Sequence, residues 1–227
     1  MKSHAQSSTI VKTEVRKSNS QNVIYGLENP TTLQKAIIKS MRDSSVTVAC
    51  GRTGSGKSTA AVSESVRQLV EGSARKIYVV RPSISLLDQL PVTAHVEASL
   101  NKYLGVQKTT EYLDTGKIRG LTIDQCRHLT FKSCMVILED GNLATKYELY
   151  SLMSRLGKGS RLVILNDLES MNPDATHKAS GIKKILDRFY NGDTGLTERE
   201  FNVVMVDLQD EELVRNPSLE RILNLFN

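Results

Sequence analysis

A glycine-rich loop between a buried strand and an amphipathic helix governs the fold that this chain can adopt. Residues 46–50 read V-T-V-A-C, residues 51–59 read G-R-T-G-S-G-K-S-T, and residues 58–70 repeat apolar side chains at helical spacing. Glycine allows the left-handed backbone conformations that a tight loop needs. A strand that leads into a helix in this way pairs in parallel with a later strand, through a right-handed crossover. The segment therefore predicts an α/β protein with a parallel sheet.

The rest of the chain continues this alternation. Short continuous apolar runs, typical of strands buried on both faces, occupy residues 46–50, 77–80, 135–138, 162–165 and 203–206. Helical spacing of apolar residues recurs in residues 33–42, 58–70, 96–104, 147–156 and 182–190, and in residues 218–226. We expect a mainly parallel sheet flanked by helices over residues 29–227, preceded by a flexible N-terminal arm over residues 1–28.

Composition limits the kinds of protein that remain. The 227 residues are 39% hydrophobic and 24% charged, which fits a soluble globular chain and excludes collagen-like and wholly disordered proteins. No apolar run approaches the roughly 20 residues that span a bilayer, so we expect a cytoplasmic protein with no membrane contact. A net charge of +5 permits a polyanionic partner. The three cysteines and four histidines lack the spacing of metal sites, so we expect no metal held by them.

The glycine-rich loop satisfies the pattern G-x-x-x-x-G-K-[ST] in the strand–loop–helix context that phosphate binding requires. Its main-chain N–H groups and the positive end of the following helix form a site for an anion. We expect Lys57 to bridge the β- and γ-phosphates of ATP and the Ser58 hydroxyl to ligate Mg²⁺. Thr59 is expected to pack the helix more than to contact the nucleotide. The nucleotide-binding residues are therefore predicted to be Gly51, Thr53, Gly54, Ser55, Gly56, Lys57, Ser58 and Thr59. The alternative is a glycine-rich turn that binds no nucleotide.

An acidic pair follows the apolar run at residues 135–138. A strand that delivers Glu139 and Asp140 to the sheet edge matches a Walker B element, in which one carboxylate holds the Mg²⁺ water shell and the next orients the attacking water. The usual order is Asp then Glu, so Glu139 would reach the metal shell through one extra methylene and Asp140 would be the shorter base. The alternative is that Asp140 caps a helix and has no catalytic part.

Other polar residues follow the expected strands. Asn166 and Asp167 could sense the γ-phosphate or hold a water, or could mark a turn. Arg81 could contact nucleic acid or fix its loop, and Arg52 could contact a phosphate or be solvated. Arg215 could approach the γ-phosphate as an arginine finger, in cis or across a subunit interface, or form a surface ion pair. Lys57, Glu139, Asp140, Asp167 and Arg215 are the predicted catalytic residues.

Taken together, these elements resemble the PhoH-like family of ATPases, which is related to superfamily 1 helicases. The resemblance rests on G-R-T-G-S-G-K-S-T at Gly51, on K-I-x-x-x-R-P from Lys76, and on R-G-x-T from Arg119. Further matches are V-I-L-E-D-G-N at residues 136–142, S-R-L-G-K-G-S at 154–160, S-G-I at 180–182 and L-V-R-N-P at 213–217. They follow the family's order over residues 33–226.

The resemblance implies a P-loop NTPase fold of the RecA-like kind, ATP and Mg²⁺ as cofactors, and ATP hydrolysis. It also implies action on RNA or single-stranded nucleic acid and assembly into a homo-oligomeric ring, expected to be a hexamer. The chain departs from the family pattern at the reversed acidic pair, at Asn142 in place of Gln, and at Ser170 in place of a later Gln. Divergence of this kind suggests a phage-encoded member that works in the host cytoplasm.

Two other functions stay open at this point. A small P-loop kinase would fit the length, although no cluster of lid arginines is visible. A nucleotide-gated binding protein without turnover would fit the reversed acids. Residues 106–132, with five basic and three acidic residues, are a candidate nucleic-acid surface or an ordinary solvated connection.

Overall fold

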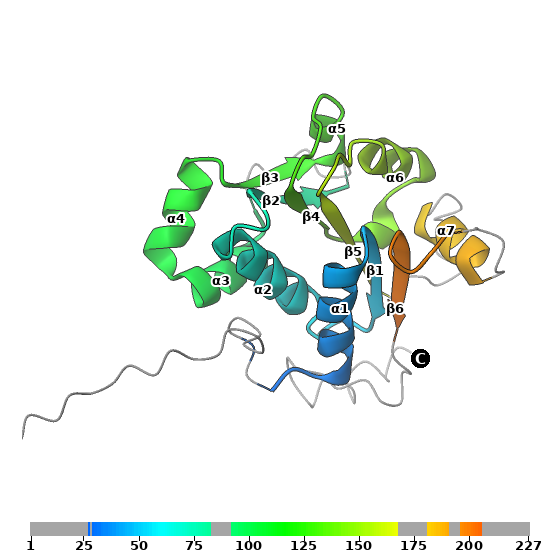
Figure 1. Ribbon diagram of the computed structural model, residues 1–227, viewed down its shortest axis with the longest axis horizontal. Coiled ribbons are helices and arrows are strands. Elements are labelled where there is room, and N and C mark those ends of the chain that lie inside the picture. The colour runs from blue at the N-terminus through cyan, green and yellow to red at the C-terminus, as the bar shows by residue number, and fades with distance from the viewer. Residues whose placement is uncertain (1–26, 28, 83–91, 168–180, 191–195, 206–227) are drawn as a thin grey trace, which may run out of the picture.

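The strands form one parallel sheet whose order places the glycine-rich loop beside later parts of the chain. The computed structural model describes residue 27 and residues 29–82, 92–167, 181–190 and 196–205. Six strands in this part pair in the order β3-β2-β4-β5-β1-β6, and all five pairs are parallel (Figure 1). They are β1 (Val46–Gly51), β2 (Lys76–Arg81), β3 (Ile118–Thr122), β4 (Cys134–Leu138), β5 (Arg161–Asp167) and β6 (Phe201–Met205). The expected parallel sheet is confirmed, with β5 lying between β1 and β4.

Helices cover both faces of the sheet. One apolar core lies under α1 (Thr32–Asp43), α2 (Lys57–Val70), α3 (Ala94–Leu104) and α4 (Val106–Asp114). The other lies under α5 (Ile123–Cys126), α6 (Lys146–Met153) and α7 (Gly181–Tyr190), and Figure 1 shows these two groups on opposite sides of the strands. A short 3₁₀ helix, η1 (Gly141–Leu143), joins β4 to α6. The result is a three-layer α/β/α fold.

The strands divide their side chains between the two cores by simple alternation. In β4, Met135 and Ile137 join the first core, whereas Val136 and Leu138 join the second. Successive side chains of a strand point to opposite faces, so a continuous apolar run is what a sheet covered on both faces needs. This explains why the central strands were visible in the sequence.

Capping and one buried ion pair fix the helices near the glycine-rich loop. Thr31 and Gln34 form a capping box at the start of α1, with each side chain bonded to the other's main-chain N–H. Glu64 of α2 is almost wholly buried and accepts hydrogen bonds from Arg42 of α1 and from Arg67. The Gln34 amide also reaches the carbonyl of Gly56 at 3.4 Å. Helix α1 therefore holds α2 and its preceding loop in place.

Two sequence expectations need correction, and two others fall mostly or wholly outside the described residues. Residues 106–132 are not a plain connection, because they contain α4, the edge strand β3 and α5. Helix α6 ends at Met153 rather than at residue 156. A turn follows Met153 and leads to Leu156, which forms a β-bridge with Phe131. The helix expected at residues 218–226 and most of the arm at residues 1–28 lie outside the described residues. Among the helices that the structure describes, none is long and apolar enough to cross a bilayer.

Candidate functional site

The glycine-rich loop joins β1 to α2 in the conformation that its glycines allow. Gly54 and Gly56 have φ angles of 89° and 84°, a region that other residues seldom adopt. Gly56 is the N-cap of α2 and has no side chain to cap it, so the main-chain N–H groups of the first turn face the space in front of the loop. Oriented N–H groups and the helix dipole together make an anion site.

Lys57 and Ser58 open α2 at this site. The ammonium of Lys57 is buried and donates to the carbonyl oxygens of Gly51 and Arg52, at 2.7 Å each. Ser58 and Thr59 are half-buried and line the same cavity. Thr59 therefore lies on the cavity wall, although packing was its expected role.

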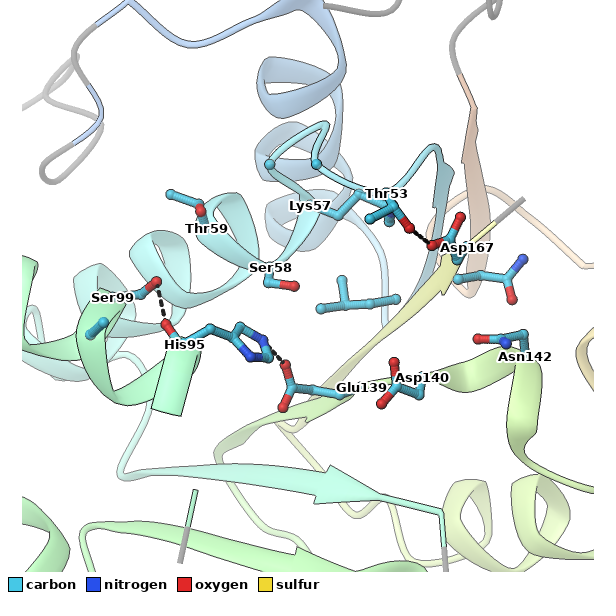
Figure 2. Close-up of a pocket in the computed structure, with 15 residues that line it drawn as sticks. Thr53, Lys57, Ser58, Thr59, His95, Ser99, Glu139, Asp140, Asn142 and Asp167 are labelled. Atoms are coloured by element: carbon cyan, nitrogen blue, oxygen red, sulfur yellow. Dashed lines mark hydrogen bonds and ion pairs between the residues drawn. The ribbon is translucent and has the colours of Figure 1, made fainter. Parts of the chain in front are cut away.

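The cavity in front of the loop measures about 460 Å³ and unites residues from several elements (Figure 2). Its walls come from the glycine-rich loop and α2, from the first turns of α3, from the residues after β4, and from the end of β5. The lining residues are Thr53, Gly54, Gly56, Lys57, Ser58, Thr59, His95, Ala98, Ser99, Glu139, Asp140, Asn142, Leu165, Asn166 and Asp167. The loop and the acidic pair, separated by some eighty residues in sequence, thus share one cavity.

Glu139 is held in this cavity by two donors from the segment that opens α3. Its carboxylate lies 2.6 Å from the Nε2 atom of His95 (Figure 2). It also accepts a 2.9 Å hydrogen bond from the Thr93 hydroxyl. The Glu139 side chain is only 4% exposed, whereas that of His95 is 49% exposed. A buried carboxylate needs such partners, since burial without them disfavours its charge. Glu139 is therefore fixed in direction before any ligand arrives.

Asp140 adopts a different arrangement from its neighbour. Its φ angle of 50° is left-handed, and its side chain makes no capping hydrogen bond to η1. Asp140 therefore occupies the N-cap position of η1, as the helix-cap alternative expected, but its side chain does not cap that helix. Burial, followed by the negative charge of Glu139, raises the pKa of Asp140 above its ordinary value, and the positive charges of His95 and Arg81 oppose the rise. The carboxylate faces the cavity (Figure 2).

Asn166 and Asp167 are the last two residues of β5 and not part of a turn. They pair in register with Cys50 and Gly51 of β1, directly before the loop. Asn166 is fully buried, and the Thr53 hydroxyl donates to the carboxylate of Asp167. Asp167 thereby connects β5 to the glycine-rich loop.

The structure places two of the three arginines that the sequence analysis named. Arg81 ends β2, and its charge acts on Asp140, so it belongs to the same edge of the sheet as the acidic pair. The main-chain carbonyl oxygen of Arg52 accepts a hydrogen bond from the ammonium group of Lys57. Arg215 lies outside the described residues. The assignments of these and the other site residues stay predictions.

His95 and Thr93 are site residues that sequence reasoning missed. His95 is followed by apolar residues at helical spacing and has no other histidine nearby in sequence, so nothing marked it. Its contact with Glu139 spans 44 positions of the chain. Only the three-dimensional arrangement of α3 against the end of β4 brings these side chains together.

With this geometry established, comparison with known proteins decides the family. The family model described as "PhoH-like protein" matches residues 27–227. The chain belongs to this family. A PhoH-like protein of Bacillus subtilis (strain 168) is 22% identical to this PhoH-like chain over 207 residues, which cover 86% of the chain and 62% of that relative. The protein PhoH2 of Thermobispora bispora is 23% identical over 77% of the chain and 44% of its own length. The PhoH-like chain thus spans less than two thirds of these curated relatives.

A solved structure supports the fold of the PhoH-like chain. The large terminase of a thermophilic bacteriophage, solved in complex with ADP, covers 87% of the chain and 50% of its own length, with a TM-score of 0.50 and 11% identity. At this level of sequence identity, the similarity between the two proteins supports the fold alone. Together with the loop and the parallel sheet, it agrees with the expected P-loop NTPase fold.

Proposed function

We propose that this protein binds Mg-ATP in the cavity between the glycine-rich loop and the acidic pair, and hydrolyses it. The observation that carries the proposal is the shared cavity itself. It places Lys57 and Ser58 opposite Glu139 and Asp140, with Asp167 at the end of the neighbouring strand (Figure 2). A phosphate-binding loop facing carboxylates is the arrangement that phosphoryl transfer to water requires.

The residues fit both the nucleotide and its metal ion. The glycine conformations and the start of α2 suit a phosphate chain. Mg²⁺ in such sites keeps several waters and takes one or two protein oxygens besides phosphate oxygens. The hydroxyl of Ser58 and the carboxylate of Glu139 would supply those oxygens. The bound ion would neutralise the negative charge that develops on the phosphates.

Each residue then has a distinct part in hydrolysis. Lys57 would leave its two carbonyl partners and hold the β- and γ-phosphates, whose negative charge it would offset. Asp140 would orient the attacking water and accept its proton. Asp167 orients Thr53 of the loop, and through it the loop's approach to the γ-phosphate.

A second candidate, a nucleotide-gated binding protein without turnover, has one observation in its favour. Glu139 stands where an aspartate is usual, and its carboxylate is already engaged by His95 and Thr93. A glutamate held in this way could support ATP binding while placing the metal unfavourably for hydrolysis. Measured turnover separates the two candidates.

The same proposal includes partners and location. We propose that the protein acts on RNA or single-stranded nucleic acid, as a homo-oligomeric ring in the cytoplasm, with a hexamer as the expected size. The net charge of +5 and membership of the PhoH-like family support a nucleic-acid partner. In such a ring Arg215 would act as the arginine finger, in cis or from a neighbouring subunit. A phage origin stays a prediction from sequence divergence.

The test is phosphate release from Mg-ATP, with and without single-stranded RNA or DNA. Lys57→Ala is expected to lower release by roughly 100-fold or more, because it removes the cation that contacts the transferred phosphate. Lys35→Ala is the matched control, since Lys35 is exposed on α1 and does not line the cavity. Release from the parent that is stimulated by a single strand supports the full proposal. No release from a parent that still binds ATP supports the binding protein instead, and transfer of phosphate to another molecule would indicate a kinase.

A further inference from the structure

Helix α6 carries the two most exposed large apolar side chains among the described residues. Tyr147 is 83% exposed and Tyr150 is 76% exposed. Residues three apart on a helix are neighbours, with Cβ atoms roughly 5–6 Å apart. Of the other tyrosines whose burial is described, Tyr78, Tyr103 and Tyr112 are buried. Helix α6 thus presents two adjacent aromatic rings to solvent.

Cationic groups lie at both ends of this face. Lys146 is exposed at the start of α6. Beyond the other end, the guanidinium of Arg155 donates to the Ser154 hydroxyl and, at 3.3 Å, to the carbonyl oxygen of Arg127. These bonds keep one cation in a fixed place at the surface. We call Lys146, Tyr147, Tyr150, Ser154 and Arg155 the α6 face.

Helix α7 carries further positive charge next to the start of α6. The N–H of Gly181 donates to the carbonyl of Ala144, and a Cβ on Gly181 would lie 2.8 Å from the Cα of Lys146. The start of α7 therefore packs directly against the start of α6. Lys183 and Lys184, both exposed, lie in this first turn of α7.

Acidic groups offset this charge only in part. Glu148 of α6 accepts hydrogen bonds from the N–H and hydroxyl of Thr145 in a capping box. Asp124 of α5 pairs with Arg127. Asp187 of α7 is exposed. The cations named on and next to α6 therefore outnumber the carboxylates by five to three.

We propose that the α6 face is a stacking platform for two neighbouring unpaired bases of a single-stranded nucleic acid. Bases stack on aromatic rings, and lysine and arginine groups contact the adjoining phosphates. A tyrosine ring also suits a surface that is apolar on its faces and wet at its hydroxyl. This inference rests on the proposed function, because it identifies where the proposed nucleic-acid partner binds. A symmetric contact with a second copy is less favoured, because it would bring the Lys146 and Arg155 cations of both copies into one interface.

The chain between the α6 face and the acidic pair is short. Asp140 is followed at once by η1, and Lys146 begins α6. Gly141 lies so close to β5 that a Cβ there would be 2.4 Å from Ile164 Cγ2. A displacement of α6 on binding would therefore be passed to Asp140 through a closely packed connection, and would produce the stimulation of hydrolysis that the proposed function expects.

The experiment measures binding of fluorescein-labelled oligouridylate and oligothymidylate by fluorescence anisotropy. Tyr147→Ala and Tyr150→Ala are each expected to weaken binding by roughly 5- to 150-fold. Tyr147→Phe and Tyr150→Phe keep the ring and are expected to bind as the parent does. Val70→Ala, at a 39% exposed apolar residue at the end of α2, is the matched control. Arg155→Ala should reduce the dependence of log affinity on log salt by ~0.7. Thermal melting checks that each variant is folded.

The outcomes separate this inference from the proposed function. If the parent binds single strands and both alanine variants bind equally well, the α6 face is not the binding surface, while the nucleic-acid partner remains. If the parent binds no single strand, the inference and that part of the proposed function fail together, and phosphate release still tests the ATPase. If the alanine variants change the sedimentation coefficient of the parent without weakening binding, the face is an interface between copies and the inference is wrong.

Discussion

The contact between His95 and Glu139 leads to a specific prediction about Mg²⁺. His95→Ala removes the donor 2.6 Å from one carboxylate oxygen and leaves Glu139 with the Thr93 hydroxyl alone. If Glu139 holds the Mg²⁺ water shell, the freed carboxylate samples orientations that do not support the ion. We therefore expect a higher Mg²⁺ requirement rather than loss of ATP binding.

The expected increase in the Mg²⁺ requirement can be estimated from the burial of the two side chains, His95 and Glu139. A hydrogen bond to a charged group contributes about 1.5–3 kcal/mol. Glu139 is almost wholly buried but the His95 ring is 49% exposed, so the lower end applies. A loss of about 1.5 kcal/mol corresponds to a roughly tenfold increase in the Mg²⁺ concentration for half-maximal phosphate release. Loss of an outer partner of a metal ligand has an effect of similar size.

The assay titrates MgCl₂ at fixed ATP and records phosphate release. His95→Gln can still donate an N–H to Glu139 and should recover most of the parent's Mg²⁺ dependence. Ser99→Ala is the control, because Ser99 lines the same cavity but bonds the main-chain carbonyl of His95. An unchanged Mg²⁺ requirement in His95→Ala, or greater turnover than the parent, would refute the positioning role of His95.

Two further predictions concern stability. Burial alone would raise the pKa of Glu64, but hydrogen bonds from Arg67 and Arg42 outweigh it and lower the pKa. The paired carboxylate therefore stabilises the fold above its ordinary pKa of about 4.5, and this contribution is lost as pH falls through the lowered value. Glu64→Gln should lower the free energy of unfolding in urea by about 3 kcal/mol at neutral pH and by less under acid conditions; a constant difference would contradict this account. Gly141→Ala should lower the free energy of unfolding by about 1–3 kcal/mol, because the added Cβ would overlap Ile164 and approach a main-chain carbonyl of β5. An unfolding midpoint equal to that of the parent would show that the packing can adjust.

The central part of the fold could be predicted because its residues are buried on two faces. Continuous apolar runs revealed β1, β2, β4, β5 and β6 to within a few residues of their ends. The edge strand β3 lacks this signal, since only Ile118 is buried and Arg119 is exposed. Helix α4 buries only Thr109 and Tyr112, which is too little to mark a helix in sequence.

The parts of the candidate site that follow a strand directly could also be predicted from the sequence. The glycine-rich loop is contiguous, so its chemistry could be read directly from the residues. The acidic pair was found because it follows a strand. Thr93 and His95 could not be found in this way, because their role depends on packing α3 beside the end of β4. The exposed tyrosines of α6 could be assigned only after the buried face of that helix was known.

The position of β1 within the sheet has a consequence for synthesis of the chain. Val46 pairs with Leu162 on one side and with Phe201 on the other, so both neighbours of β1 come from much later in the sequence. During translation the strand that leads into the glycine-rich loop emerges first but has two unpaired edges until those segments follow. Pairing over such long separations is slow, and open strand edges favour association with other chains. A nascent chain of this protein is therefore expected to be most prone to aggregation before residue 205 has left the ribosome.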